Sequence, residues 1–161
     1  MCDYSIMHVD NRLAQQGETL ATHRFGTGVV GLASADDLRN HSAWSATQSS
    51  SRIADAVMKM VSNNRPPVVC AICIPPGAVL KLAGIPQAIQ RKFGLGANAT
   101  VTFDQLDMDA NNFRDGVRFE SGRTALLQEF TEGISVEVVS LENTREREVI
   151  EETTYAHMGA R

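Results

Sequence analysis

The sequence lacks the features that would place the chain in a membrane, an export pathway or a nucleic-acid complex. No apolar run approaches the roughly 20 residues of a bilayer-spanning helix. The opening Met1–Asp10 has no basic segment followed by an apolar one, as a signal peptide would. With 15 Lys+Arg against 19 Asp+Glu, the net charge of −4 offers no basic surface for a phosphate backbone. We therefore expect a cytoplasmic protein that binds neither nucleic acid nor membrane.

Cysteine is also scarce, because the 161 residues include three cysteines, Cys2, Cys70 and Cys73. In a chain without an export signal we expect reduced thiols rather than a disulfide framework. Cys70 and Cys73 have C-x-x-C spacing, but they lie in an extended apolar run, where residues three apart point to opposite faces. We therefore predict that both are buried structural cysteines.

Two further motifs lack a part that their chemistry needs. The sequence GTGVVG at 26–31 matches the dinucleotide-binding G-x-G-x-x-G, but the residues after it look extended, so a glycine bend is expected instead. Asp107 begins a stretch like a calcium loop, in which Asn112 replaces the required glycine and Arg118 the required glutamate. Neither motif identifies a cofactor, and the cofactor stays unknown.

The apolar pattern predicts many strands and few helices. Strands are expected at 2–9, 19–25, 29–33, 68–74, 78–82, 100–106, 117–119, 123–130 and 134–141. The last of these alternates most clearly and should lie in the core. Helices are expected after Ser34, with Leu38 and Trp44 on the buried side, at 53–61, and from Pro86 to Phe93. The serine-rich stretch 45–51 is expected to be a loop.

Together these elements predict a single α+β domain over residues 1–141. We expect a curved antiparallel sheet or small open β-barrel, covered by two or three helices. Residues 36–64 are a candidate helical insertion in this domain. Residues 142–161 form a charged C-terminal tail.

Cys2 is the first candidate catalytic residue. If Met1 is removed, the α-amine of Cys2 can serve as base for its own thiol, as in N-terminal-nucleophile hydrolases and class II glutamine amidotransferases. His23 is the other candidate base, because His8 would lie about 20 Å from Cys2 along one strand. One hypothesis is therefore a cysteine-nucleophile hydrolase or amidotransferase-like enzyme that uses Cys2 and His23.

Cys2, His8 and His23 are also candidate metal ligands, because thiolate and imidazole groups need only meet in space to bind a transition metal. A small metalloprotein is thus a second hypothesis. The sequence favours a third, a non-catalytic domain that binds a protein or small-molecule partner or assembles as a homo-oligomer. It is favoured because alternating strands and turns are plentiful, whereas no convergent set of titratable groups stands out.

Four stretches of the chain carry a recognisable pattern. They are MCDYS at 1–5, RFGTG at 24–28, CIPPG at 73–77, and the closing stretch from Leu126 to Leu141. Together they resemble a group of uncharacterised bacterial proteins that begin with the same pentapeptide. The likeness covers most of residues 1–141 and is least over 36–64. Because the group has no assigned activity, the resemblance implies a bacterial cytoplasmic domain and leaves the function open.

Overall fold

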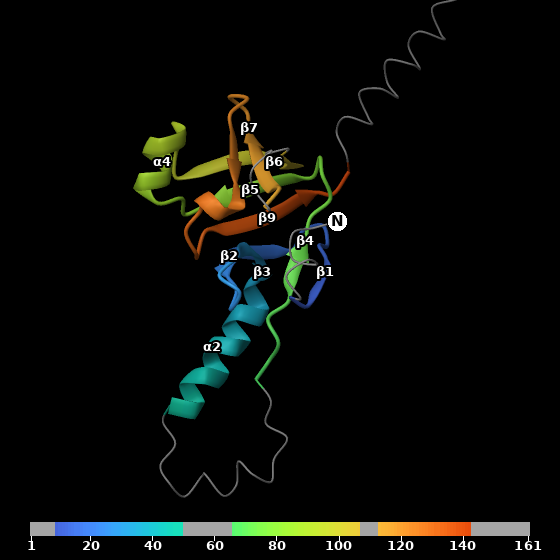
Figure 1. Ribbon diagram of the computed structural model, residues 1–161, viewed down its shortest axis with the longest axis vertical. Helices are drawn as coiled ribbons and strands as arrows, with labels where there is room; N and C mark the ends of the chain where they lie inside the picture. Colours follow the sequence, from blue (N-terminus) through green and yellow to red (C-terminus); the bar gives the residue numbers. More distant parts are fainter. Residues whose placement is uncertain (1–8, 50–65, 107–112, 143–161) are drawn as a thin grey trace, which may run out of the picture.

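The computed structural model describes residues 9–49, 66–106 and 113–142. These residues form one nine-stranded sheet that curls into a half-barrel, with helices α2 (Ala35–Ser49) and α4 (Gln87–Phe93) and a short 3-10 helix, η1 (Leu127–Glu129) (Figure 1). In sheet order the strands are β1 (Asn11–Leu13), β4 (Ala71–Cys73), β3 (Val30–Ser34), β2 (Thr19–Arg24), β9 (Ser135–Ser140), β5 (Val79–Ala83), β6 (Asn98–Gln105), β7 (Asp115–Phe119) and β8 (Thr124–Leu126).

The predicted curved sheet with covering helices is confirmed, but the sheet is mixed rather than antiparallel. Strands β1 and β4 pair in parallel, whereas the other neighbours pair antiparallel. A parallel pair requires a long connection, and here the chain passes through β2, β3 and α2 between the two strands. Within the described ranges the order ends at β1 and β8 without pairing these edges, so the half-barrel stays open.

The alternation of β2 separates two hydrophobic clusters on opposite faces of the sheet. Leu20 is fully buried in the larger cluster, which also receives strands β5, β6, β7 and β9 and helix α4. Phe25, two residues on from His23 on the other face, joins a smaller cluster against Leu38 of α2. Helix α2 thus covers one face of the β2–β3 region, and its far end extends away from the body of the domain (Figure 1).

Strands β2 and β9 pair where the two halves of the sheet meet, and Thr22 stabilises this junction. Thr22 is 3% exposed, and its hydroxyl donates to the Thr131 carbonyl at 2.7 Å and accepts from the Ile134 N–H at 2.9 Å. Its backbone N–H donates to the Ile134 carbonyl at 3.0 Å, and its carbonyl accepts from the Gly133 N–H at 2.9 Å. One buried residue therefore fixes the whole turn at 131–134 against β2.

A second long-range contact is made by the side-chain amide of Gln128 in η1. It accepts from the Val30 N–H at 3.0 Å and donates to the Val30 carbonyl at 2.8 Å, as a neighbouring strand would. The expected strand at 123–130 is therefore wrong beyond Leu126, because the chain turns into η1 and a side chain takes over the pairing.

Helix α2 begins directly after Ser34, as predicted, but it continues to Ser49 through the stretch expected to be a loop. The serines misled this interpretation, since the chain between Gly31 and Pro66 contains neither glycine nor proline to stop a helix. Trp44, expected to be buried, is only half-buried. Helix α4 matches its prediction and ends at Gly94, whose φ of 71° gives a left-handed cap.

The strand expected at 134–141 is confirmed, since Ile134, Val136 and Val138 are buried. The strand expected at 68–74 is shorter, because only 71–73 pair with neighbours and Val68 is 61% exposed. The predicted helix at 53–61 lies outside the described residues, as do residues 2–8 of the strand predicted at 2–9 and residues 143–161 of the tail predicted at 142–161. No helix in the described ranges is long and apolar enough to span a bilayer.

We expect Thr22→Val to lower the free energy of unfolding by about 2 kcal/mol, because it leaves the Ile134 N–H and the Thr131 carbonyl buried without their partner. Thr19→Val is the matched control, since Thr19 is exposed on the same strand. It should change the stability by less than about 0.5 kcal/mol. Urea unfolding followed by circular dichroism measures both, and equal stabilities of the two variants would contradict the role of Thr22.

Candidate ligand-binding cleft

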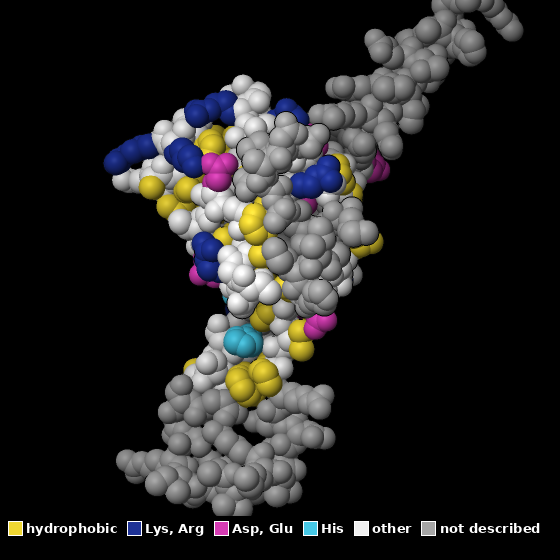
Figure 2. Space-filling model, viewed as in Figure 1, with side chains coloured by type: hydrophobic (Ala, Val, Ile, Leu, Met, Phe, Trp, Pro, Cys, Tyr) yellow, Lys and Arg dark blue, Asp and Glu magenta, His cyan; other side chains and the backbone are white. Residues whose placement is uncertain are grey.

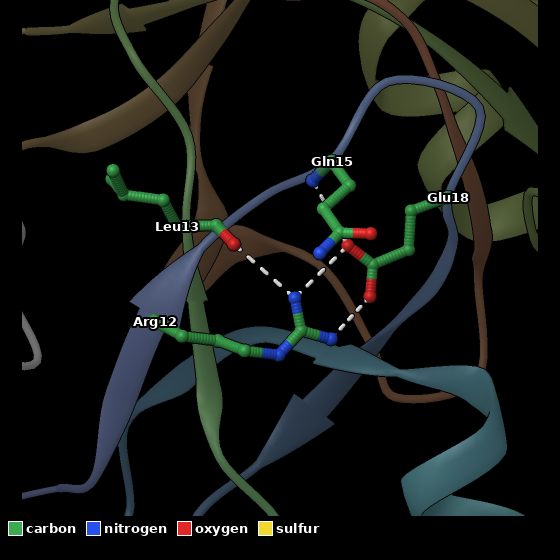
Figure 3. A network of polar contacts seen from close by, with 4 residues as sticks. All are labelled: Arg12, Leu13, Gln15 and Glu18. Carbon is green, nitrogen blue, oxygen red and sulfur yellow. Dashed lines mark hydrogen bonds and ion pairs between the residues drawn. The ribbon is translucent and has the colours of Figure 1, made fainter.

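The first of two larger clefts on the described surface lies where the β1–β2 turn meets the start of α2. It has a volume of about 650 Å³ and is lined by polar and charged residues, Arg12 and Glu18 among them. Arg12 forms a bidentate ion pair with Glu18, with Nη1 at 3.1 Å from Oε2 and Nη2 bonded to Oε1 (Figure 3). The same guanidinium donates to the Leu13 carbonyl at 3.2 Å.

These contacts serve the turn rather than a ligand. Glu18 also accepts the Gln15 N–H at 3.1 Å, so its carboxylate holds both ends of the β1–β2 turn (Figure 3). The mutual hydrogen bonds raise the pKa of Arg12 and lower that of Glu18, which keeps both groups charged. Because each charge is neutralised by the other, we assign this pair a structural role.

The second cleft lies between the α2-covered face of β2, the first half of α2, the chain at 66–69 and the turn before β9. Its volume is about 680 Å³. Leu38, His41 and Ser42 line it from α2, since residues three and four apart share one helix face. Its walls are largely apolar, and its polar groups are the side chains of His23, His41, Ser42 and Glu132. We call this the His23 cleft.

His23 and Glu132 form the polar centre of this cleft. The imidazole Nδ1 lies 3.3 Å from Glu132 Oε1, and the ring packs edge-on against Phe25 with centroids 4.9 Å apart. The same Glu132 oxygen accepts the Arg24 N–H at 2.7 Å, which anchors the carboxylate to β2. Because a carboxylate only accepts hydrogen bonds, a proton on Nδ1 is favoured, which leaves Nε2 as an acceptor.

Burial lowers the pKa of His23 from its ordinary value. The negative charge of Glu132 opposes this shift, and electrostatic repulsion between the two imidazoles of His23 and His41 adds to it. The imidazole of His23 is therefore neutral at pH 7. The cleft thus presents a neutral imidazole beside a carboxylate, an arrangement that can bind a hydrogen-bond donor or accept a proton.

The structure places one of the three predicted site residues. His23 lies in the cleft, whereas Cys2 and His8 lie outside the described residues, so their catalytic and metal-binding roles stay predictions. Among the described residues, no group of three or more His, Cys, Asp or Glu side chains could hold a metal ion. The sequence analysis missed Glu132 and His41, because a turn residue and a helix residue carry no local signal of meeting a distant strand.

The two cysteines of the C-x-x-C stretch differ from the prediction and from each other. Cys70 is a free thiol and half-buried, whereas Cys73 is buried. Cys73 is disulfide-bonded, so the expectation of reduced thiols is wrong for Cys73. The two residues flank Ala71 and Ile72 in extended chain, which turns their side chains apart and prevents a bond between them.

The glycine motif at 26–31 forms a turn between two strands, as predicted. Gly28 has a φ of 86°, and its N–H donates to the Phe25 carbonyl at 2.8 Å. Val29 then lies opposite Phe25 on the returning chain. Strand β3 follows rather than a helix, so the helix N-terminus of a dinucleotide site is not formed here.

We expect the pKa of His23 to lie below its ordinary value of 6.5. Glu132→Gln should lower it further by removing a favourable negative charge, and His41→Asn should raise it by removing the electrostatic repulsion from the second imidazole. Titration of the imidazole signals by NMR measures all three values, and the same proteins in urea give the unfolded reference. A wild-type pKa at or above 6.5, or equal values in both variants, would contradict this electrostatic account.

The His23 cleft is therefore the feature of the described surface from which a function can be argued. No family model, no curated protein and no solved structure matches the chain. What supports a function is the chemistry of the residues that line the cleft.

Proposed function

We propose that this chain is a binding domain that takes a small organic ligand in the His23 cleft. The observation that carries the proposal is the meeting of apolar walls with a few polar groups from four separate parts of the chain. A volume of about 680 Å³ is typical of small-molecule sites, which combine apolar area for affinity with few polar groups for orientation.

The surroundings of the cleft support a site that exists before the ligand arrives. Thr22 fixes the turn at 131–134, and the Arg24 N–H fixes the Glu132 carboxylate, so His23 and Glu132 do not have to be brought together by binding. A site held in this way loses little conformational entropy when it is occupied.

The described surface favours a small ligand over self-assembly through the sheet. Its large exposed hydrophobic side chains are Leu13, Val68 and Val139, at 74%, 61% and 45% exposure. They are three side chains, whereas a stable interface requires a contiguous apolar patch of several hundred Å². Val68 lies in the cleft itself, where a ligand would cover it.

A hydrolase that uses His23 as its base is a second candidate, and the His23–Glu132 contact favours it. A histidine oriented by a carboxylate is the base that such a reaction uses. The two candidates differ in turnover, because a binding domain releases a bound ester unchanged and a hydrolase releases acid and alcohol.

The test of the binding proposal uses amide NMR shifts of the labelled protein with water-soluble aromatic and alicyclic fragments as probes. We expect shifts concentrated at 21–25, 38–42 and 132–133. Ser42→Trp should abolish them, because a large side chain at an exposed helix position fills the cleft. Asn40→Trp is the matched control, since Asn40 is exposed on the same helix but does not line the cleft. Shifts that are scattered, or that survive Ser42→Trp, would contradict the proposal.

A further inference from the structure

The negative charge of Glu132 dominates the described lining of the His23 cleft. Among its described lining residues, Glu132 is the single carboxylate, and neither lysine nor arginine is present. Several Lys and Arg side chains gather instead over α4, at the opposite end of the body from α2 (Figure 2). Among the described residues, a ligand in the cleft therefore meets a negative charge without a neighbouring lysine or arginine that would offset it.

The arginine next to Glu132 in space does not change this balance. Arg24 contacts Glu132 through its backbone N–H, not through its guanidinium. Its side chain alternates to the other face of β2 from His23, and Nη1 donates to the Gly28 carbonyl at 2.8 Å. The positive charge of Arg24 is thus engaged at the β2–β3 turn.

Both polar groups at the centre of the cleft have acceptor capacity to spare. Glu132 is 52% exposed, and none of the described residues donates a hydrogen bond to its Oε2 atom. His23 is 29% exposed and turns Nδ1 toward Glu132, so Nε2 keeps its lone pair. A partner that donates hydrogen bonds and carries positive charge satisfies both groups, whereas a carboxylate ligand would meet two acceptors and a like charge.

We propose that the ligand of the His23 cleft is an amphiphilic amine, with a protonated amino group near Glu132 and His23 and an apolar body against Phe25, Leu38 and Val68. This inference rests on the proposed binding function and names the ligand's chemical class. An ammonium group has three donors and no acceptor, which matches the carboxylate and the imidazole nitrogen. The apolar body supplies most of the affinity, and the ammonium sets the orientation.

The experiment compares three probes with the same ring system: 2-aminoindane, 2-indanol and indane-2-carboxylate. Each is titrated into the wild-type protein at pH 7 while amide shifts are followed. We expect the amine to bind in the cleft about five-fold more tightly than the alcohol, and the carboxylate more weakly than the alcohol. A five-fold preference corresponds to about 1 kcal/mol, the size of one partly exposed charge interaction.

Two variants assign this preference to a residue. Glu132→Gln keeps an oxygen that can accept the Arg24 N–H but removes the charge, and it should erase the advantage of the amine over the alcohol. Glu120→Gln is the control, because it removes one negative charge from an exposed position outside the cleft. The amine preference should survive in it.

The outcomes separate the two claims. If the alcohol or the carboxylate binds in the cleft as tightly as the amine, the binding function stands and the amine inference is wrong. If none of the three probes shifts the cleft residues, the binding proposal fails with it. If Glu132→Gln does not fold, the comparison of the three probes on the wild-type protein still decides the question.

Discussion

The arrangement of this molecule depends on one buried hydroxyl group at the joint of the sheet. Thr22 ties β2 to the chain before β9, because it bonds to Thr131 and Ile134 through its side chain and to Gly133 and Ile134 through its backbone. Strand β9 pairs with β2 on one side and with β5 on the other, so this joint connects the two halves of the half-barrel. The same joint positions Glu132, which follows Thr131 directly.

Strand β2 therefore serves packing and site formation at once. One face places Leu20 and Thr22 in the larger core, and the other places His23 and Phe25 toward α2. The buried face of β2 fixes the strand in place. The side chains on its other face are therefore positioned as well, because side chains of one strand alternate. The Arg12–Glu18 pair shows the contrast, since its two charges neutralise each other in holding a turn, whereas the charge of Glu132 stays half-exposed beside a neutral imidazole.

Local patterns in the sequence predicted the individual strands and helices well, but they predicted poorly which of these elements pair or pack together. The alternation at 134–141 and the Pro86 and Gly94 boundaries of α4 follow from backbone geometry within a few residues, so they could be found directly. The serine-rich end of α2 was misread because serine favours turns only where the chain is free to leave the helix. The parallel β1–β4 pair arises between distant segments, and no periodicity encodes it.

The candidate site shows the same division. His23 was selected from the sequence for its residue type, but its neighbours Glu132 and His41 were not, because one lies in the turn before β9 and the other at an exposed helix position. The pKa of His23 is set by burial and by these two neighbours, all of which depend on tertiary structure. The residue type suggested His23 as a titratable group. The residues that surround His23 could be known only from the tertiary structure.

Glu132 lies against Nδ1 of His23, which leaves Nε2 of the neutral ring available to the cleft. Long-range proton–nitrogen NMR of the imidazole at pH 7 tests this directly, because it tells which ring nitrogen carries the proton. The account predicts a neutral ring protonated at Nδ1. A ring protonated at Nε2, or at both nitrogens, would contradict it.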